Sequence, residues 1–266
     1  MKKYSYPLTG LLLLCLLTLS CKKNGVHELS TTPAGTGARI KFFNFAIAAP
    51  AVNFYANEQK IAAVVSSNGT ESAAGVAYGS VFPAINYSLL PAGSYTFKSM
   101  IPEKAAALPG TVLTQREQRL EEGHAYSFYT CGPYQTGGNT TDSFILEDVL
   151  PAVADSLVQV RFVNTIANAA TALDLFLQPA AGGQTFQVAS GIAYKSGSAF
   201  ISLPAGNYAV FSRYPGSADN LISRSGSAGV SLVSGQAYTI GARGDMTVSG
   251  AAAVSRPYMD LTSNRP

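Results

Sequence analysis

A duplication that spans most of the chain constrains its fold more than any other feature. Five short blocks in residues 38–150 recur in the same order in residues 156–262. The paired blocks are Lys41–Asn44 with Arg161–Asn164, Val52–Tyr55 with Leu173–Phe176, Val76–Tyr78 with Ile192–Tyr194, Leu90–Tyr95 with Leu203–Tyr208, and Leu120–Tyr126 with Leu232–Tyr238. Because the period is about 115 residues, we expect two whole domains in tandem rather than a solenoid of small units.

Apolar and polar side chains alternate inside both copies, which predicts β-strands. Ile40 and Phe42 alternate with Lys41, and the second copy has Arg161 in the place of Lys41. Alternation of this kind, with turn residues between the runs, is typical of antiparallel strands that bury one face and leave the other in water. We therefore expect an all-β chain in which Lys41 and Arg161 face solvent.

The number of alternating runs predicts two tandem antiparallel β-sandwich domains of immunoglobulin-like or transthyretin-like type. Each copy also carries the pattern Leu-x-x-Gly-x-Ala-Tyr, which ends at Tyr126 and Tyr238. This pattern looks like the tyrosine corner of Greek-key sandwiches, where the phenol hydroxyl bonds a backbone group upstream. Both tyrosines are therefore expected to be structural.

The N-terminus resembles a bacterial lipoprotein signal. Basic residues Lys2 and Lys3 precede an apolar run at 11–19, and Ser20 stands before Cys21. The run is shorter than the roughly 20 residues that a membrane-spanning helix needs. The resemblance implies cleavage before Cys21, acylation of its thiol and anchoring in a membrane leaflet; the alternative is an ordinary secretory signal that happens to contain a cysteine.

These patterns divide the chain into a signal peptide at 1–20, a flexible tether at 21–37, one domain at 38–150 and another at 156–262. In the short joint between the domains, Asp155-Ser156-Leu157 resembles the acceptor of periplasmic O-glycosylation in Bacteroidetes. Ser156 is therefore a candidate glycosylation site.

Composition excludes several classes of partner and linkage. Without Lys2 and Lys3 the chain holds 16 basic and 15 acidic side chains, a formal charge of +1, so nucleic acid is not an expected partner. One of the three cysteines leaves with the signal and Cys21 is the acylation site. Only Cys131 remains, so no disulfide is expected within the chain.

No residue set in the sequence points to catalysis, a metal or a cofactor. His27 and His124 are the only histidines, and no group of His and Cys has the spacing of a zinc site. The adjacent pair Glu121 and Glu122 has Val233 and Ser234 as its counterpart, which is not the pattern of paired catalytic carboxylates. We therefore expect a protein that is not an enzyme and has no cofactor.

Loops differ most between the copies, and loop tips on a rigid sandwich commonly carry binding specificity. The segment 132–139 offers one aromatic ring and several amides, so Tyr134, Gln135 and Asn139 are the candidate ligand residues. A second hypothesis is a flat aromatic surface for sugars, made of side chains that point away from their strands' core face. Its members would be Tyr55, Phe176, Phe43 and Tyr129.

The repeated blocks resemble the bacterial family called domain of unknown function 4397 (DUF4397). The likeness is carried by strands such as Arg161–Asn164 and Leu173–Phe176 and by the Leu-Pro-Ala-Gly-x-Tyr pieces, in two copies from 38 to 262. It implies tandem, lipid-anchored envelope modules of Bacteroidetes type and assigns no reaction. The segment Phe45–Pro50 departs from the polar, acidic turn of many family members.

Together these features predict a non-catalytic, lipid-anchored protein of the cell envelope, most simply in the outer membrane, facing the periplasm or the surface. It would act as a binding, adhesion or scaffolding module, attached to the membrane by its lipid and bound to an envelope protein or a glycan. Two alternatives stay open at this stage. One is a carbohydrate-binding accessory lipoprotein of a glycan-uptake system, and the other is a fimbrial subunit.

Overall fold

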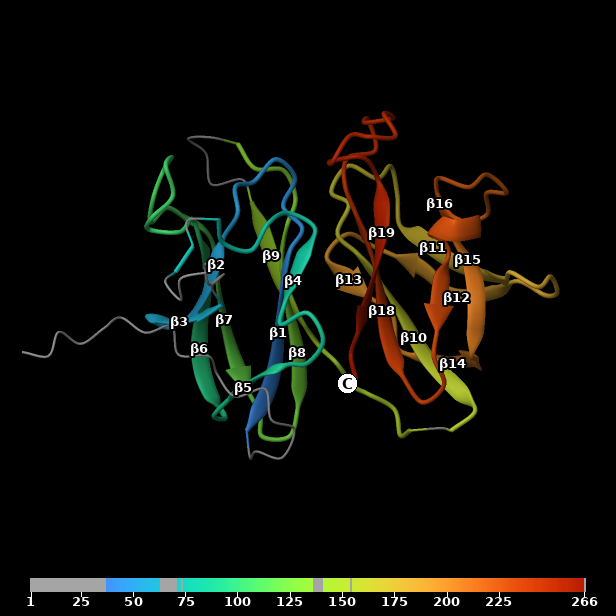
Figure 1. The fold of residues 1–266 in the computed structure, drawn as a ribbon, viewed down its shortest axis with the longest axis horizontal. Coiled ribbons are helices and arrows are strands. Elements are labelled where there is room, and N and C mark those ends of the chain that lie inside the picture. Colours follow the sequence, from blue (N-terminus) through green and yellow to red (C-terminus); the bar gives the residue numbers. More distant parts are fainter. Residues whose placement is uncertain (1–36, 63–70, 73, 136–140, 154, 266) are drawn as a thin grey trace, which may run out of the picture.

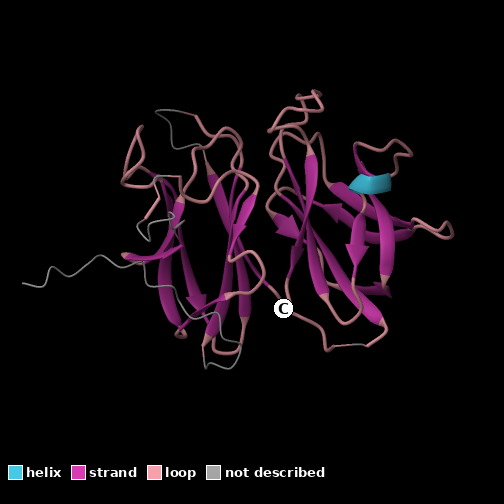
Figure 2. Cartoon of the chain, in the orientation of Figure 1, coloured by secondary structure: helices cyan, strands magenta, loops and turns pink. Residues whose placement is uncertain are grey.

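A computed structural model describes residues 37–62, 71–72, 74–135, 141–153 and 155–265 (Figure 1). The described chain is nearly all β, as the alternation predicts, and η2 (Gly226–Ala228) is a short 3-10 helix (Figure 2). Among these residues, no helix has the length and apolar character needed to cross a membrane. The predicted signal and tether, with Cys21, lie outside the described residues.

The first half of the structure, residues 38–147, consists of two packed sheets. The inner sheet has the strand order β4-β1-β8-β9, with β5 also paired to β1, and the outer sheet has the order β3-β2-β6-β7. The strands are β1 (Ala38–Asn44), β2 (Asn53–Ala56), β3 (Gln59–Ala62), β4 (Ser80–Phe82), β5 (Ser88–Leu90), β6 (Gly93–Met100), β7 (Val112–Leu120), β8 (Ala125–Cys131) and β9 (Asp142–Glu147).

The second half, residues 157–263, repeats this plan. Its inner sheet has the order β13-β10-β18-β19 with β14 on β10, and its outer sheet has the order β12-β11-β15-β16 with β17 on β15. The strands are β10 (Leu157–Asn164), β11 (Leu173–Pro179), β12 (Phe186–Ile192), β13 (Ser196–Gly197), β14 (Ile201–Pro204), β15 (Gly206–Arg213), β16 (Ile222–Arg224), β17 (Val230–Leu232), β18 (Ala237–Arg243) and β19 (Tyr258–Ser263).

Each half has its own hydrophobic core between its two sheets. In the first half Phe42 stacks on Phe54 with ring centroids 5.0 Å apart, and the rings of Phe97 and Phe128 pack around them. The second core is mainly aliphatic and is centred on Phe162. Burying such large apolar side chains is the main favourable contribution to folding.

One pair of strands in each half is parallel, which the prediction of purely antiparallel sheets misses. Strand β1 pairs with β8 from Arg39 opposite Ala125 to Asn44 opposite Thr130, and β10 pairs with β18 in the same way. Between β1 and β8 the chain passes through the outer sheet and then returns in its original direction. A parallel pair needs such a long crossover connection.

The two inner sheets pack against each other in the middle of the molecule (Figure 1). A third cluster of apolar side chains fills this contact, formed by Phe43, Phe45, Tyr129, Cys131, Phe144 and Val163. Strands β1, β8, β10 and β18 are therefore buried on both faces. Lys41 and Arg161 are 0% and 2% exposed, so the expectation that they face solvent is wrong. Each half covers the face of the other half's inner sheet that alternation assigns to water.

The structure confirms the predicted tyrosine corners. The hydroxyl of Tyr126 accepts a hydrogen bond from the backbone N–H of Glu121 at 3.1 Å. The hydroxyl of Tyr238 accepts one from the N–H of Val233 at 3.4 Å. A second tyrosine pair follows the Pro-Ala-Gly turns, with Tyr208 donating to the carbonyl of Pro204 at 2.6 Å.

Candidate functional site

Two of the sequence-predicted ligand residues, Tyr134 and Gln135, lie in the loop that follows β8. Tyr134 is half-buried and Gln135 is exposed, directly after β8. Asn139 lies outside the described residues. Ser156, the candidate glycosylation site, is exposed in the turn before β10, far along the chain from this loop. The structure thus places one of the predicted ligand residues, Tyr134, in contact with a surface that other loops build.

Three loops meet at one end of the first half: residues 45–52 after β1, residues 101–111 between β6 and β7, and the segment that follows β8. The first and third are tied by backbone hydrogen bonds from Ile47 N–H to the carbonyl of Gly132 at 2.8 Å and from Tyr134 N–H to the carbonyl of Ile47 at 2.9 Å. The middle loop closes on itself through Ile101 and Thr111, whose backbone hydrogen bond measures 2.9 Å. The sequence alone proposes only the loop after β8 as a ligand site, and it marks Phe45–Pro50 merely as a departure from the family pattern.

Between the three loops lies a pocket of about 620 Å³, within the range of small-ligand sites. Its walls are Ala48, Ala49, Pro50, Ala51, Ile101, Ala105, Ala107, Leu108 and Tyr134. Five of these are alanines, whose short side chains leave space that larger ones would fill. The lining is apolar except for the Tyr134 hydroxyl and backbone groups, and Leu108 is 46% exposed at the rim.

The equivalent loops of the second half are joined by polar side chains. Asn168 donates to a carboxylate oxygen of Asp245 at 2.7 Å and accepts from the N–H of Met246 at 3.1 Å. The hydroxyl of Tyr214 accepts from the N–H of Ala170 at 3.1 Å. Hydrogen bonds from Thr247, and then from Asn168, hold the pKa of Asp245 below its usual range. Side-chain hydrogen bonds join the loops at this end of the second half, whereas alanines line a pocket between the equivalent loops of the first half.

A model of the family described as "Domain of unknown function (DUF4397)" matches residues 38–176, which include all of the first half and the strands β10 and part of β11. The match covers more than half of the chain. The protein belongs to the DUF4397 family. All three loops of the apolar pocket lie inside the matched region. A search of curated proteins found no match.

Solved structures resemble this DUF4397 protein only distantly. The family 26 carbohydrate-binding module of Eubacterium rectale Amy13K, in complex with maltoheptaose, is 11% identical with a TM-score of 0.22, over 87% of this chain and 97% of that one. A candidate cell adhesion protein from Bacteroides ovatus is 13% identical with a TM-score of 0.22, over 86% and 96%. The TIE protein of Bacillus anthracis is 11% identical with a TM-score of 0.21, and this chain spans 32% of its length.

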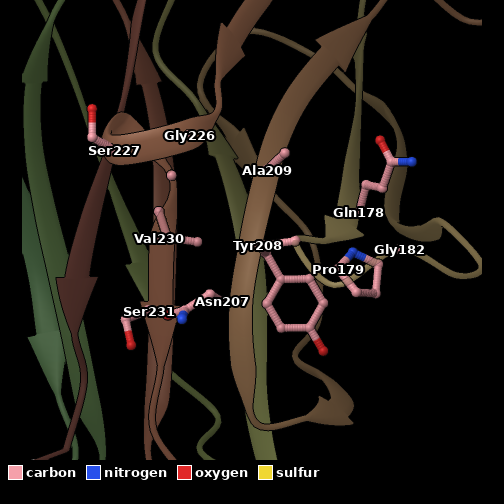
Figure 3. A pocket seen from close by; sticks show the side chains of 12 residues that line it. Gln178, Pro179, Gly182, Asn207, Tyr208, Ala209, Gly226, Ser227, Val230 and Ser231 are labelled. Carbon is pink, nitrogen blue, oxygen red and sulfur yellow. The ribbon is translucent and has the colours of Figure 1, made fainter.

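A second pocket, of about 680 Å³, lies on the outer sheet of the second half (Figure 3). Gln178 and Asn207 supply amide groups to its lining, and Ser231 supplies a hydroxyl group. Ala209, on β15, adds an apolar side chain. Tyr208 is 3% exposed and its hydroxyl donates a hydrogen bond to the carbonyl of Pro204, so its ring is not a free stacking surface. The lining of this pocket is about half polar, whereas the lining of the first-half pocket is mostly apolar.

The hypothesis of an exposed aromatic surface is wrong for Phe43 and Tyr129. Their exposures are 1% and 0%, and their rings stack at 4.3 Å between the two inner sheets. Both rings belong instead to the contact between the two halves. Tyr55 is 8% exposed, and Phe176 is stacked on Phe211 beneath the guanidinium of Arg213. None of these four rings offers a bare face for a sugar.

The thiol of Cys131 is fully buried in the contact between the halves. Its sulfur lies 3.5 Å from the hydroxyl of Tyr194, which donates to Asp142 at 2.9 Å. Burial raises the pKa of the Cys131 thiol to about 12, which disfavours the reactive thiolate. Within the described part of the chain, no group of three or more His, Cys, Asp or Glu residues is placed to hold a metal ion.

Proposed function

We propose that this DUF4397 protein is a non-catalytic lipoprotein of the cell envelope, and that its two immunoglobulin-like domains form a binding or adhesion module. The observation that carries the proposal is the apolar pocket built by three loops at one end of the first half. The loops at the ends of β-sandwich folds commonly carry binding sites because the sheets hold these loops in fixed positions.

The chemistry of the pocket favours a protein partner over a sugar. A glycan needs hydrogen-bond partners for its hydroxyl groups, and the walls of this pocket are nearly all aliphatic. A volume of about 620 Å³ accepts one or two large apolar side chains. Such an anchor in a desolvated pocket commonly contributes much of the binding free energy between proteins.

The position of the pocket suits an anchored protein. Strand β1 begins at Ala38 on the lower edge of the first half, and the three loops lie on the opposite, upper edge (Figure 1). With a lipid on Cys21 at the far end of the N-terminal segment, the pocket would face away from the membrane. This arrangement leaves the site open to a partner on another molecule.

Filling the pocket tests the proposed site. Ala107 lines it, whereas the neighbouring Ala106 is exposed but does not. We expect Ala107→Trp to weaken binding of the purified protein to native envelope proteins at least tenfold, and Ala106→Trp to leave binding nearly unchanged. Equal binding by wild type and Ala107→Trp, with unchanged melting temperatures, would remove the pocket from consideration.

The anchor has its own test. Cys21→Ala should abolish labelling by a fatty-acid analogue in cells and leave the protein unprocessed or released from the outer membrane. Undiminished labelling would show that Cys21 is not the lipid site, without bearing on the pocket.

Carbohydrate binding is the second candidate, and the polar pocket in Figure 3 is the observation that favours it. Amides and a hydroxyl in a row are suited to the hydroxyl groups of a glycan. On a glycan array, binding that is lost in the double variant Gln178→Ala and Asn207→Ala and kept in Ala107→Trp would support this candidate. A fimbrial role needs a strand exchanged between copies, and β19 is already paired along its whole length with β18.

A further inference from the structure

The contact between the two halves is built from equivalent positions of the duplication. The aligned blocks make Tyr78 equivalent to Tyr194, and the corner tyrosines Tyr126 and Tyr238 set the register of β8 and β18. By that register Tyr129 corresponds to Gly241 and Cys131 to Arg243. The three equivalent pairs, Tyr78 with Tyr194, Tyr129 with Gly241 and Cys131 with Arg243, all lie at the contact between the halves.

Equivalent residues meet reciprocally across this contact. Cys131 of the first half touches Tyr194 of the second, with 3.5 Å between sulfur and hydroxyl. Arg243, the counterpart of Cys131, lies over the ring of Tyr78, the counterpart of Tyr194, at 4.7 Å. A contact in which position i meets j and j meets i is the signature of a two-fold, isologous interface. The two halves are arranged like the subunits of a symmetric dimer.

The side chains at this contact are nevertheless complementary and not alike. Phe45 of the first half lies against Gly241, where an added Cβ would be 3.0 Å from the ring carbon Cε2. Leu146 lies against Gly197, where an added Cβ would be 2.7 Å from Cδ1 of the leucine. Neither glycine has a left-handed φ, so the backbone conformation does not call for glycine. Glycine is needed at these two positions because the other half approaches so closely.

The first half carries large residues at the positions of these glycines. Tyr129 stands where the second half has Gly241, and Val81 stands where it has Gly197, because β4 and β13 pair with β1 and β10 in the same register. Two first halves placed in this arrangement would drive Tyr129 into Phe45. Two second halves would each bury Arg161 without Asp148, since Asn264 holds the equivalent position.

We propose that the inner sheet of the first half is an interaction surface specific for a second half, and that the two halves remain a bound pair without their covalent joint. The partner is recognised by glycines that admit Phe45 and Leu146 and by a buried arginine that pairs with Asp148. A first half does not pair with another first half. This inference is independent of the proposed function.

Cutting the joint in the folded protein tests the pairing. Val149 and Val153 in the joint are 71% and 62% exposed, so a protease site in place of residues 151–155 is accessible. The chain from Lys22 onward, carrying that site, is cleaved and followed by size exclusion with light scattering during dilution. The two fragments should elute together with the mass of the intact chain. Separation at micromolar concentration, or dimers of first halves, would overturn the proposal.

Substitution of Gly241 tests the specificity of the pairing between the two halves. Gly241→Tyr installs the residue that the first half carries there, and overpacking of this size should weaken the cleaved pair about 10- to 100-fold. Adding Phe45→Ala to the same chain removes the obstructing ring and should restore most of the affinity. Gly250→Tyr, in an exposed turn, is the matched control and should pair like wild type. An unchanged dissociation constant for Gly241→Tyr, with both cores still melting cooperatively, would contradict the proposal.

Discussion

Arg161 donates a hydrogen bond from Nη2 to Oδ1 of Asp148, and this ion pair joins the two halves at a place that water does not reach. The side chains are 3% and 0% exposed. Burial lowers the pKa of the Arg161 guanidinium, but the charge and hydrogen bond of Asp148, together with Tyr129 and Tyr87, outweigh it, so the pKa is raised. The same carboxylate accepts hydrogen bonds from Tyr87 at 2.6 Å and Ser127 at 2.8 Å.

Removal of one partner should therefore be costly. Asp148→Ala leaves a buried guanidinium without its counterion, and we expect a loss of about 3–5 kcal/mol in the free energy of unfolding. Urea denaturation measures it. Glu58→Ala is the control, since Glu58 pairs with Lys98 while 90% exposed, and it should cost below about 1 kcal/mol. Equal small losses in both variants would mean that water enters the contact.

The tyrosine corners should contribute measurably to stability. Tyr126→Phe removes the acceptor of the Glu121 N–H, and Tyr238→Phe removes that of the Val233 N–H. Each should reduce the free energy of unfolding by about 1–2 kcal/mol, the usual cost of leaving a shielded polar group without its partner. Thermal or urea unfolding gives the values. A change of only a few tenths at both sites would show that these hydroxyls are not structural.

Lys41 should make stability depend on alkaline pH. Burial lowers the pKa of its ammonium from 10.5 to about 8, with the charge of Asp148 acting in the opposite direction. Below pH 8 the folded chain holds a buried charge, and as pH rises from 8 to 10.5 the folded state loses this proton before the unfolded state does. Stability relative to Lys41→Met should therefore rise by about 3 kcal/mol across that window. A constant difference between the two proteins from pH 7 to 10 would contradict this.

Cys131 should report on the contact between the halves. In a chain that starts at Lys22 it is the only cysteine, and its thiol is fully buried. A thiol reagent at neutral pH should label it slowly in the native protein and rapidly in urea. Gly241→Tyr should increase the native labelling rate, whereas Gly250→Tyr should not. Rapid labelling of the wild type would place the thiol at an open surface.

Ser156 should be accessible to a modifying enzyme because it is exposed in the turn before β10. If the acceptor resemblance holds, intact-mass analysis of protein from its native host should show a glycan that disappears in Ser156→Ala. Ser227, which is exposed in the short helix η2 and lies outside such a motif, provides the control substitution Ser227→Ala. An unmodified native peptide around Ser156 would reject the site.

Much of the fold could be predicted from the sequence because duplication and two-residue alternation are local signals. The corners at Tyr126 and Tyr238 carry a fixed pattern, and their hydrogen bonds follow it. The second buried face of the inner sheets could not be predicted in this way. Lys41 and Arg161 have the chemistry of surface residues, but the docking of one half on the other buries both side chains, and Arg161 pairs with Asp148 across the contact.

The candidate site was predictable only in part for a similar reason. Tyr134 stands out as an aromatic residue in a loop of turn-forming neighbours. The alanines at 48, 49, 51, 105 and 107 look unremarkable in the sequence, and they matter because the fold brings their loops together. A pocket made by small side chains leaves no chemical motif, since it consists of space between loops that are distant in the chain.

The parallel pairing of β1 with β8 has a mechanical consequence for a molecule held at one end. A pull between the N-terminal segment and a partner on the upper loops would enter the fold at Ala38 and run along β1. The hydrogen bonds from Arg39 opposite Ala125 to Asn44 opposite Thr130 lie across that direction, so they would be loaded in shear and would share the force. Strands sheared along their length must break several bonds at once, whereas peeled strands lose them singly. If the proposed lipid anchor holds the N-terminal segment, β1 is thus the strand best placed to bear tension.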